Sequence, residues 1–509
     1  MTALWTAAEL VAATGGCLSR PFVAQGVAID TRGLAAGDLF VALRGLRRDG
    51  HGFVAEALAR GAAGAMVARD APGMMTLRDA PGMMTLRDAP GVMTLRDAPG
   101  VMTLRDAPGT GDPPDAPGDR DRPAAAPLLL VADTLAGLTA LGAAGRARFG
   151  GRVVAITGSV GKTTTKEMLR TILAATAPTH AASASHNNHW GVPLTFARLP
   201  ATAAFCIAEL GMNHAGEIAS LARLARPHVA MITAIGPAHI GNLGSLDAIA
   251  AEKAAILAGL VPGGVAILPA DSPFLPLLVA ATQAAGAARV LTFGAGPAAT
   301  VRLLAAHPGP DGIRLAADVA GSAVALDLAA PGRHMALNAL AALAAAVSLG
   351  VPAAAAAALG GFRPIAGRGA RQSLAWPGGQ VRLLDESYNA NPASMRAALA
   401  VLATEPATRR VAVLGDMLEL GAHGPGEHAG LAPEVAAAAD AVFACGPLMR
   451  HLCAALPETL PVRHATDAAA LAALIAPAIR PGDAVLVKGS LGSNMKLIVA
   501  ALARPAEAG

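Results

Sequence analysis

The sequence is poor in aromatic and charged residues. Phe, Trp and Tyr make up 3% of the 509 residues and charged residues 15%, and the formal net charge is only +4. The chain also has no block of consecutive Lys and Arg residues. Proteins that bind nucleic acids usually show such a basic patch, so we expect no nucleic-acid partner.

The sequence also has few cysteines and no run that predicts a membrane span. The four cysteines form no Cys-X-X-Cys pair, which favours a reduced, cytoplasmic protein. The N-terminal stretch MTALWTAAELVAATGG lacks a positively charged region, so we expect no secretory signal. The most membrane-like run, NALAALAAAVSLGVPAAAAAALGG, is mostly alanine and contains Pro352. It predicts a helix, a turn and a second helix, not a membrane span.

The chain does have length and a repeated alternation of apolar runs and helical stretches. Its 509 residues suffice for two to four domains. Apolar runs such as RVVAIT, FCIAEL, VAMITAI, VAVLGDM and AVLVKGS are separated by alanine-rich stretches, which predicts α/β layers with largely parallel sheets. We place an N-terminal domain at residues 1–147, a central domain at 148–359 and a C-terminal domain at 360–509.

One segment departs from this alternation. From Arg69 the unit RDAPGMMTL recurs with small changes as far as Gly109, and a Pro/Asp/Gly-rich stretch follows to about residue 122. Each unit has one Asp-Ala-Pro-Gly turn and too little apolar surface to form a core. We interpret it as a mobile insertion in the N-terminal domain. A functional module such as a β-solenoid is the alternative, although the calcium-binding nonapeptide is absent.

The stretch VVAITGSVGKTTTKEML predicts a strand, a phosphate-binding loop and a helix. The expected loop residues are Gly158, Ser159, Val160, Gly161, Lys162, Thr163 and Thr164. Lys162 would reach the terminal phosphates, and the Thr163 hydroxyl would bind Mg²⁺. Ile156 stands where the full pattern has glycine, so the loop is a variant, and an ordinary glycine turn that caps a helix is the alternative.

Polar residues follow the next predicted strands. Glu209 ends FCIAEL, His239 comes just after VAMITAI, and Lys253 lies one helix further on. If these strands flank the loop strand, Glu209, His239 and Thr163 converge on one or two Mg²⁺ ions beside a triphosphate. Each residue also has a structural alternative: Glu209 as a helix cap, His239 as a core histidine, and Lys253 as a surface residue.

Two amide-bearing segments add candidates. Asn187 and Asn188 precede a Gly-Val-Pro turn, where paired amides either bind a polar substrate or stabilise the turn. Asn338 lies within a predicted helix, an unfavourable place for asparagine, and its amide is suited to contact adenine.

The predicted C-terminal domain begins with a further group of polar residues. The strand-like segment QVRLLDESYNANPASM contains Asp385, Tyr388, Asn389 and Asn391. Arg368 follows the Gly/Pro/Arg linker and is placed to reach phosphate when domains close.

Taken together, these segments resemble the Mur ligases. The resemblance is carried by ITGSVGKTTT, HNNHWGVPLT, AELGMNHAGEI, AHIGNLGSLDAIAAEKAAI, GRHMALNALAA, DESYNANPASM, LGDMLELG and VLVKGS, and the repeat is the departure. It implies a central P-loop-type ATPase domain between an N-terminal UDP-substrate domain and a C-terminal Rossmann-like ligase domain. DESYNANPASM and LGDMLELG point to the members that join D-alanyl-D-alanine to UDP-N-acetylmuramoyl-tripeptide in peptidoglycan synthesis.

The resemblance also implies roles for single residues. Thr163 and Glu209 would bind a first Mg²⁺ and His239 a second, with Lys253 a further ligand if it is carbamylated. Asn187 and Asn188 would contact the muramoyl peptide, Asn338 adenine, and Arg368 phosphate. The catalytic set would be Lys162, His239, Lys253 and Asp385, with Tyr388, Asn389 and Asn391 at the substrate. The UDP end would meet Asp30, Thr31, Arg32, Asp49, Gly50 and His51.

The implied reaction uses ATP and Mg²⁺ to convert a carboxylate into an acyl phosphate, which the dipeptide amine attacks. We expect a monomer. Three alternatives remain from the sequence: another Mur-type or folylpolyglutamate-type amide ligase, a P-loop switch protein or kinase, and a non-catalytic nucleotide-binding scaffold.

The repeat is open to a direct test. Deleting residues 69–109 and rejoining the chain should leave turnover largely intact, because the repeat carries none of the implied site residues. Turnover of the full chain and the deletion variant would be compared after circular dichroism shows that both are folded. A large loss of activity in a folded deletion variant would assign the repeat a function.

Overall fold

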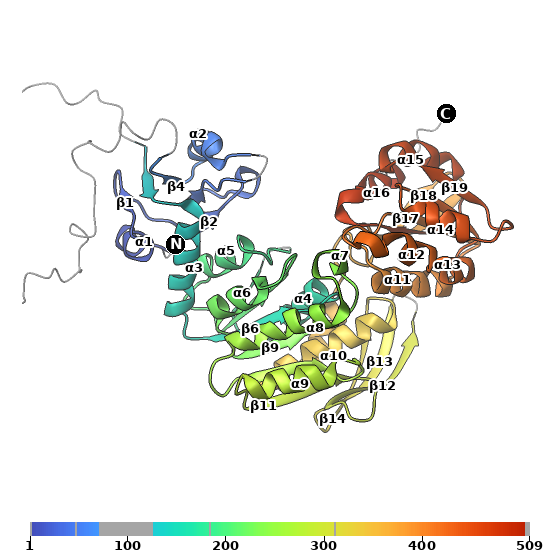
Figure 1. Cartoon of the computed structure of the whole chain (residues 1–509), viewed down its shortest axis with the longest axis horizontal. Helices are drawn as coiled ribbons and strands as arrows, with labels where there is room; N and C mark the ends of the chain where they lie inside the picture. The colour runs from blue at the N-terminus through green and yellow to red at the C-terminus, as the bar shows by residue number, and fades with distance from the viewer. Residues whose placement is uncertain (1–2, 46–47, 71–125, 183–184, 310–311, 504–509) are drawn as a thin grey trace, which may run out of the picture. The chain divides into compact units, whose positions relative to one another are not determined.

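The computed structural model describes residues 3–45, 48–70, 126–182, 185–309 and 312–503 (Figure 1). The chain divides into two compact units, residues 1–149 with 193–201 and residues 150–192 with 202–509. Three mostly parallel sheets confirm the predicted α/β class. No helix in these ranges is both long and apolar enough to cross a membrane. The repeat from residue 71 onward lies outside the described residues.

The first unit is built on a five-stranded sheet of order β1-β5-β4-β3-β2. The neighbours from β5 to β2 are parallel, and β1 joins the edge antiparallel. Helices α1 and α3 pack against each other beside it, and α2 lies on β4. The bounds are α1 Ala7–Thr14, β1 Cys17–Leu18, β2 Gly26–Ala28, η1 Thr31–Gly33, β3 Asp38–Val41, η2 Gly50–Phe53, α2 Val54–Ala59, β4 Gly64–Ala68, β5 Leu128–Val131 and α3 Thr134–Arg148.

Residues 193–201 return to this first unit and complete its core. They include most of helix α5 (Gly191–Ala197). The indole N–H of the buried Trp5 donates a 2.8 Å hydrogen bond to the carbonyl oxygen of Ala197. Helix α3 can approach only because residue 145 is glycine, since a Cβ there would lie 2.1 Å from the carbonyl oxygen of Phe196.

The second unit contains a nine-stranded sheet of order β14-β13-β12-β11-β10-β9-β6-β8-β7. The strands from β7 to β12 are parallel, and β13 and β14 extend the sheet antiparallel. Its bounds are β6 Arg152–Thr157, β7 Thr179–Ala181, β8 Phe205–Glu209, β9 Val229–Ile232, β10 Val265–Pro269, β11 Arg289–Gly294, β12 Val301–Pro308, β13 Ile313–Val319 and β14 Ser322–Leu328. The loop strand β6 therefore lies between β8 and β9, which is the neighbourhood that the sequence prediction required.

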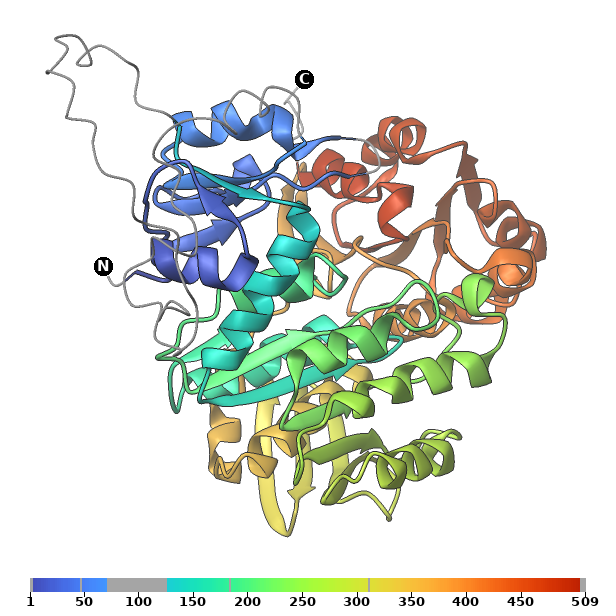
Figure 2. The same cartoon turned by 60° about the vertical axis from the view of Figure 1, so that its left-hand side comes forward.

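Helices cover both faces of this sheet (Figures 1 and 2). Contacts place α4, α10 and η6 on one face and α6, η5, α8 and α9 on the other. This cover explains why β6 and β9 read as continuous apolar runs. The predicted helix, turn and helix over the alanine-rich run is α10 followed by η6, and the second piece is a 3₁₀ helix. The bounds are α4 Lys162–Ala174, α6 Glu217–Ala225, α7 Ile240–Leu243, α8 Leu246–Ala254, η5 Ala255–Gly259, α9 Leu275–Ala284, α10 Arg333–Ser348 and η6 Ala353–Gly361.

The second unit also contains a six-stranded sheet of order β15-β16-β20-β17-β18-β19. Only the β15–β16 pair is antiparallel. The carboxyl ends of the neighbouring strands β16, β20 and β17 therefore share one edge. The bounds are β15 Ala370–Trp376, β16 Gly379–Glu386, α11 Pro392–Thr404, β17 Arg409–Gly415, η7 Gly421–His423, α12 Gly424–Ala429, α13 Ala432–Ala438, β18 Ala441–Cys445, α14 Met449–Ala455, β19 Val462–Ala465, α15 Ala468–Ile475, η8 Ala476–Ala478, β20 Asp483–Lys488, η9 Leu491–Ser493 and α16 Lys496–Ala503.

The packing of α3 gives a stability prediction. Gly145→Ala should lower the free energy of unfolding of the first unit by about 1–3 kcal/mol, because the overpacked Cβ outweighs the better helix propensity of alanine. Gly52→Ala is the control, since nothing lies within 4 Å of a Cβ at that position. Urea unfolding would compare the two variants. If Gly145→Ala unfolds with the same free energy as wild type, α3 does not approach the Phe196 carbonyl oxygen as closely as described.

Candidate active site

The loop between β6 and α4 has a backbone that only glycine fits at two positions. Gly158 and Gly161 have φ values of 148° and 82°. A Cβ on Gly158 would lie 1.9 Å from Thr233 Oγ1, and one on Gly161 would lie 2.5 Å from Asn338 Oδ1. Asn338 projects from α10, so the predicted adenine contact lies against the phosphate-binding loop.

Hydrogen bonds to the end of β9 hold this loop. The Ser159 hydroxyl donates to the Gly236 carbonyl oxygen at 2.9 Å, and the Thr233 hydroxyl donates to the Val160 carbonyl oxygen at 2.5 Å. The variant position Ile156 is still inside β6, where it pairs with Glu209 on β8 and is fully buried. The chain has not yet turned at residue 156, so glycine is not needed there.

The carboxylate of Glu209 accepts hydrogen bonds from two polar side chains next to the loop. Thr163 Oγ1 donates to one carboxylate oxygen of Glu209 at 2.9 Å, and Asn187 Nδ2 donates to the other at 2.8 Å. Both Thr163 and Glu209 are 1% exposed. Lys162 Nζ donates to the Gly158 carbonyl oxygen at 2.7 Å. The structure thus brings the predicted residues Lys162, Thr163, Asn187 and Glu209 together.

Cationic side chains surround the same loop. Burial lowers the pKa of Lys162; Glu209 opposes this effect and Arg368 adds to it. Burial, followed by the charge of Lys162, holds the pKa of Lys253 well below its ordinary value. The neighbouring carboxylate of Glu252 accepts hydrogen bonds from the backbone N–H groups of residues 216 and 218, at 2.8 and 2.9 Å, and so is committed to the start of α6. Glu252 still offsets part of the effect on Lys253, so three cationic groups and two carboxylates gather around the loop.

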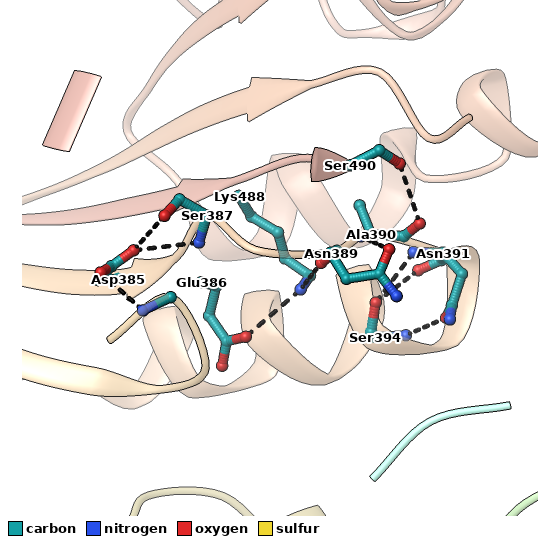
Figure 3. A network of polar contacts seen from close by, with 10 residues as sticks. Asp385, Glu386, Ser387, Asn389, Ala390, Asn391, Ser394, Lys488 and Ser490 are labelled. Carbon is teal, nitrogen blue, oxygen red and sulfur yellow. Dashed lines mark hydrogen bonds and ion pairs between the residues drawn. The ribbon is translucent and has the colours of Figure 1, made fainter. Parts of the chain in front are cut away.

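Arg368 reaches the loop region from the segment before β15. Its Nη2 donates to Ser185 Oγ at 2.8 Å, and its guanidinium lies over the Tyr388 ring, 4.2 Å from the ring centroid. Asp385 supports this arrangement, because one carboxylate oxygen accepts from the Gly367 N–H at 2.8 Å. The other accepts from the Ser387 hydroxyl at 2.6 Å (Figure 3). Asp385 thus holds the turn that carries Arg368.

The loop after β16 is held by the end of β20 (Figure 3). Lys488 Nζ donates to the Asn389 carbonyl oxygen at 2.9 Å and lies 3.4 Å from Glu386 Oε2. Asn391 caps α11, because its Oδ1 accepts from the Ser394 N–H at 2.9 Å. Lys488 was not among the predicted site residues, although a lysine that ends an apolar strand was the available signal. Burial lowers its pKa, with Glu386 opposing and Arg368 adding to the effect.

His239 and Asn188 make separate contacts. Asn188 Oδ1 accepts from the N–H groups of Trp190 and Gly191 and so caps the start of α5. His239 precedes α7, and its Nδ1 lies 2.7 Å from Glu419 Oε2. Across the described ranges no group of three His, Cys, Asp or Glu side chains forms a metal cluster. Mg²⁺ commonly takes one or two protein oxygens and completes its shell with phosphates and water, so the buried Thr163 and Glu209 oxygens fit a first ion.

In the first unit, the residues predicted to meet the UDP end form two capped turns. Asp30 caps η1 and pairs with Arg32, whose hydrogen bonds lower the pKa of Asp30 to about 2. Asp49 caps η2 and lies 2.6 Å from Nδ1 of His51. Nε2 of His51 accepts from the Ala68 N–H at 2.9 Å, so both ring nitrogens have partners within the unit. Thr31 is buried, and Gly50 begins η2.

Comparisons with known proteins show the family to which the chain is similar. Three family models match: Mur ligase family, catalytic domain, at residues 23–76; Mur ligase middle domain at 156–346; and Mur ligase, glutamate ligase domain, at 374–491. A UDP-N-acetylmuramoyl-tripeptide–D-alanyl-D-alanine ligase from Synechocystis sp. is 33% identical over 95% of this chain and 93% of its own. One from Bacillus subtilis is 31% identical over 94% and 93%. A crystal structure of MurF from Acinetobacter baumannii covers 98% of both chains, with a TM-score of 0.77 at 29% identity.

The glycine loop gives a binding prediction. Gly161→Ala should weaken binding of a non-hydrolysable ATP analogue with Mg²⁺ by roughly 10-fold or more, because the positive φ and the Asn338 contact both resist a Cβ. Gly263→Ala is the matched control, since Gly263 has a φ of 77° but open space around its Cβ position. Calorimetric titration would measure both affinities. Equal affinities for the two variants would mean that Asn338 yields easily and that the loop tolerates the change.

Proposed function

Because the chain belongs to the Mur ligase family, as its motifs predicted, we propose that it joins D-alanyl-D-alanine to UDP-N-acetylmuramoyl-tripeptide. The reaction forms an amide bond at the expense of ATP and yields the pentapeptide precursor of peptidoglycan. Both relatives carry this activity in their names, and the solved structure described above is named MurF.

The observation that carries the proposal is the glycine loop itself, which has the ammonium of Lys162 and the buried oxygens of Thr163 and Glu209 beside it. Lys253 and Arg368 add positive charge near Lys162, and the carboxylates of Glu209 and Glu252 offset part of it. Burial of unpaired charge costs free energy, which an incoming polyanion offsets. A triphosphate beside a carboxylate substrate is such a polyanion.

The residues next to the loop fit Mg²⁺ by the chemistry of their donors. Thr163 and Glu209 offer buried oxygens for a first ion, and His239 offers a ring nitrogen for a second. Bound Mg·ATP supplies the γ-phosphoryl group that activates the substrate carboxylate as an acyl phosphate. Burial holds the pKa of Lys253 well below its ordinary value, which favours the neutral amine; that amine could take up CO₂ with release of a proton, and the carbamate would add oxygen ligands.

The other side chains would bind and orient the nucleotide and the substrate. Lys162 and Arg368 would neutralise the two anions that must meet, and Asn338 would contact the base. Asp385 acts through the turn that carries Arg368, and Lys488 acts through the Asn389 loop. A different Mur-type or folylpolyglutamate-type ligase, or a switch protein or kinase, is less favoured, because the near full-length relatives share one named activity. We also propose the three domains at residues 1–147, 148–359 and 360–509, a cytoplasmic location and a monomeric state.

Phosphate release from ATP tests the reaction. We expect release only when UDP-N-acetylmuramoyl-tripeptide and D-alanyl-D-alanine are both present, with a UDP-muramoyl-pentapeptide found by mass spectrometry. The acyl phosphate has no acceptor without the amine, and no carboxylate is activated without the tripeptide. Omitting each substrate in turn is the control. Release that needs neither substrate would indicate an ATPase, and release that needs another amine would indicate a sister ligase.

A further inference from the structure

Two short segments of the second unit meet backbone to backbone. The Gly241 N–H, in α7, donates a 3.1 Å hydrogen bond to the Glu419 carbonyl oxygen, in the turn after β17. Nδ1 of His239 lies 2.7 Å from Glu419 Oε2. The contact therefore joins the nine-stranded sheet, which holds the glycine loop, to the six-stranded sheet, which holds the Asn389 loop.

Both partners in the ion pair have an uncommon backbone conformation. His239 has a φ of 64° and Glu419 a φ of 67°. Non-glycine residues rarely adopt this left-handed region, and such outliers gather at functional sites, where the surrounding structure holds them in place. Two residues with left-handed backbones that face each other across one contact indicate that the surrounding structure holds both backbones in place to make this contact.

The approach of the two segments requires a pair of glycines. A Cβ on Gly241 would lie 2.6 Å from the Gly421 nitrogen and 3.0 Å from the Glu419 carbonyl oxygen. A Cβ on Gly421 would lie 2.9 Å from Gly241 Cα. Larger residues at either position would move Glu419 away from His239.

The ion pair by itself adds little stability. The Glu419 side chain is 51% exposed and that of His239 21% exposed. Exposed pairs of this kind contribute little to the free energy of unfolding. The Nδ1 atom of His239 is itself buried, and it lies within hydrogen-bond distance of Glu419 Oε2.

We propose that Glu419 is a positioning residue for the His239 imidazole. The Glu419 carboxylate would accept a hydrogen bond from Nδ1–H of His239 and so leave Nε2 to face a second divalent cation at the nucleotide, as carboxylates behind metal-binding histidines commonly do. The second metal site is then complete only when the turn after β17 is docked on α7. The inference rests on the proposed function, because His239 meets a metal there.

The test measures ion binding and not turnover. Mn²⁺ would be titrated into the full chain with a non-hydrolysable ATP analogue and followed by electron paramagnetic resonance. The variants are Glu419→Gln and Glu458→Gln, the latter an exposed glutamate before β19 that matches the charge change. We expect the first Mn²⁺ to bind all proteins alike, and the second to bind Glu419→Gln roughly 10–100-fold more weakly.

Two further variants separate positioning from a general structural effect. In His239→Ala, which lacks the imidazole, adding Glu419→Gln should have no further effect on the second ion. Gly241→Ala keeps both side chains but separates the segments, so it should weaken the second ion as Glu419→Gln does.

The inference falls if wild type takes up no second ion, or if Glu419→Gln or Gly241→Ala binds it as wild type does. It also falls if Glu419→Gln weakens the second ion further in the His239→Ala background. Because ion binding is measured without an amine substrate, a wrong ligase assignment would appear in the omission assay and leave this result unchanged.

Discussion

Positive charge buried around a glycine loop is the constraint on which the site depends. Lys162 and Lys253 both have pKa values lowered by burial, and Arg368 lies close enough to add to the effect at Lys162. Such a cluster is costly in the absence of ligand, since charges removed from water need partners. In the proposed function, a substrate made of phosphates and a carboxylate would offset this cost with its negative charge.

The order of the strands makes this concentration of charge possible. With β6 between β8 and β9, the loop, Glu209 and the segment from Thr233 to His239 all emerge at one edge of the sheet. Parallel strands place their carboxyl ends together, which is where ligands bind in open α/β sheets. The six-stranded sheet repeats the arrangement, with β16, β20 and β17 ending beside the Asn389 loop.

Several residues with strong motif signals use their polar groups within the fold. Asn188 and Asn391 cap helices, both ring nitrogens of His51 have partners in the first unit, and Asp385 accepts from the turn before Arg368. Their contribution is to fix loop backbones, so that neighbouring groups are held in place before substrate arrives. Preorganisation of this kind lowers the cost of forming a catalytic arrangement.

The sequence by itself determined the α/β class, the glycine loop and the Mur ligase family. These follow from local patterns, namely apolar runs, glycines where side chains cannot fit, and motifs with fixed spacing. Only the tertiary structure decided that Ile156 remains inside a strand, that Lys488 supports the Asn389 loop, and that Glu419 meets His239. These contacts join residues distant in the chain, and their partners depend on strand order and on close backbone approach, which no local pattern records.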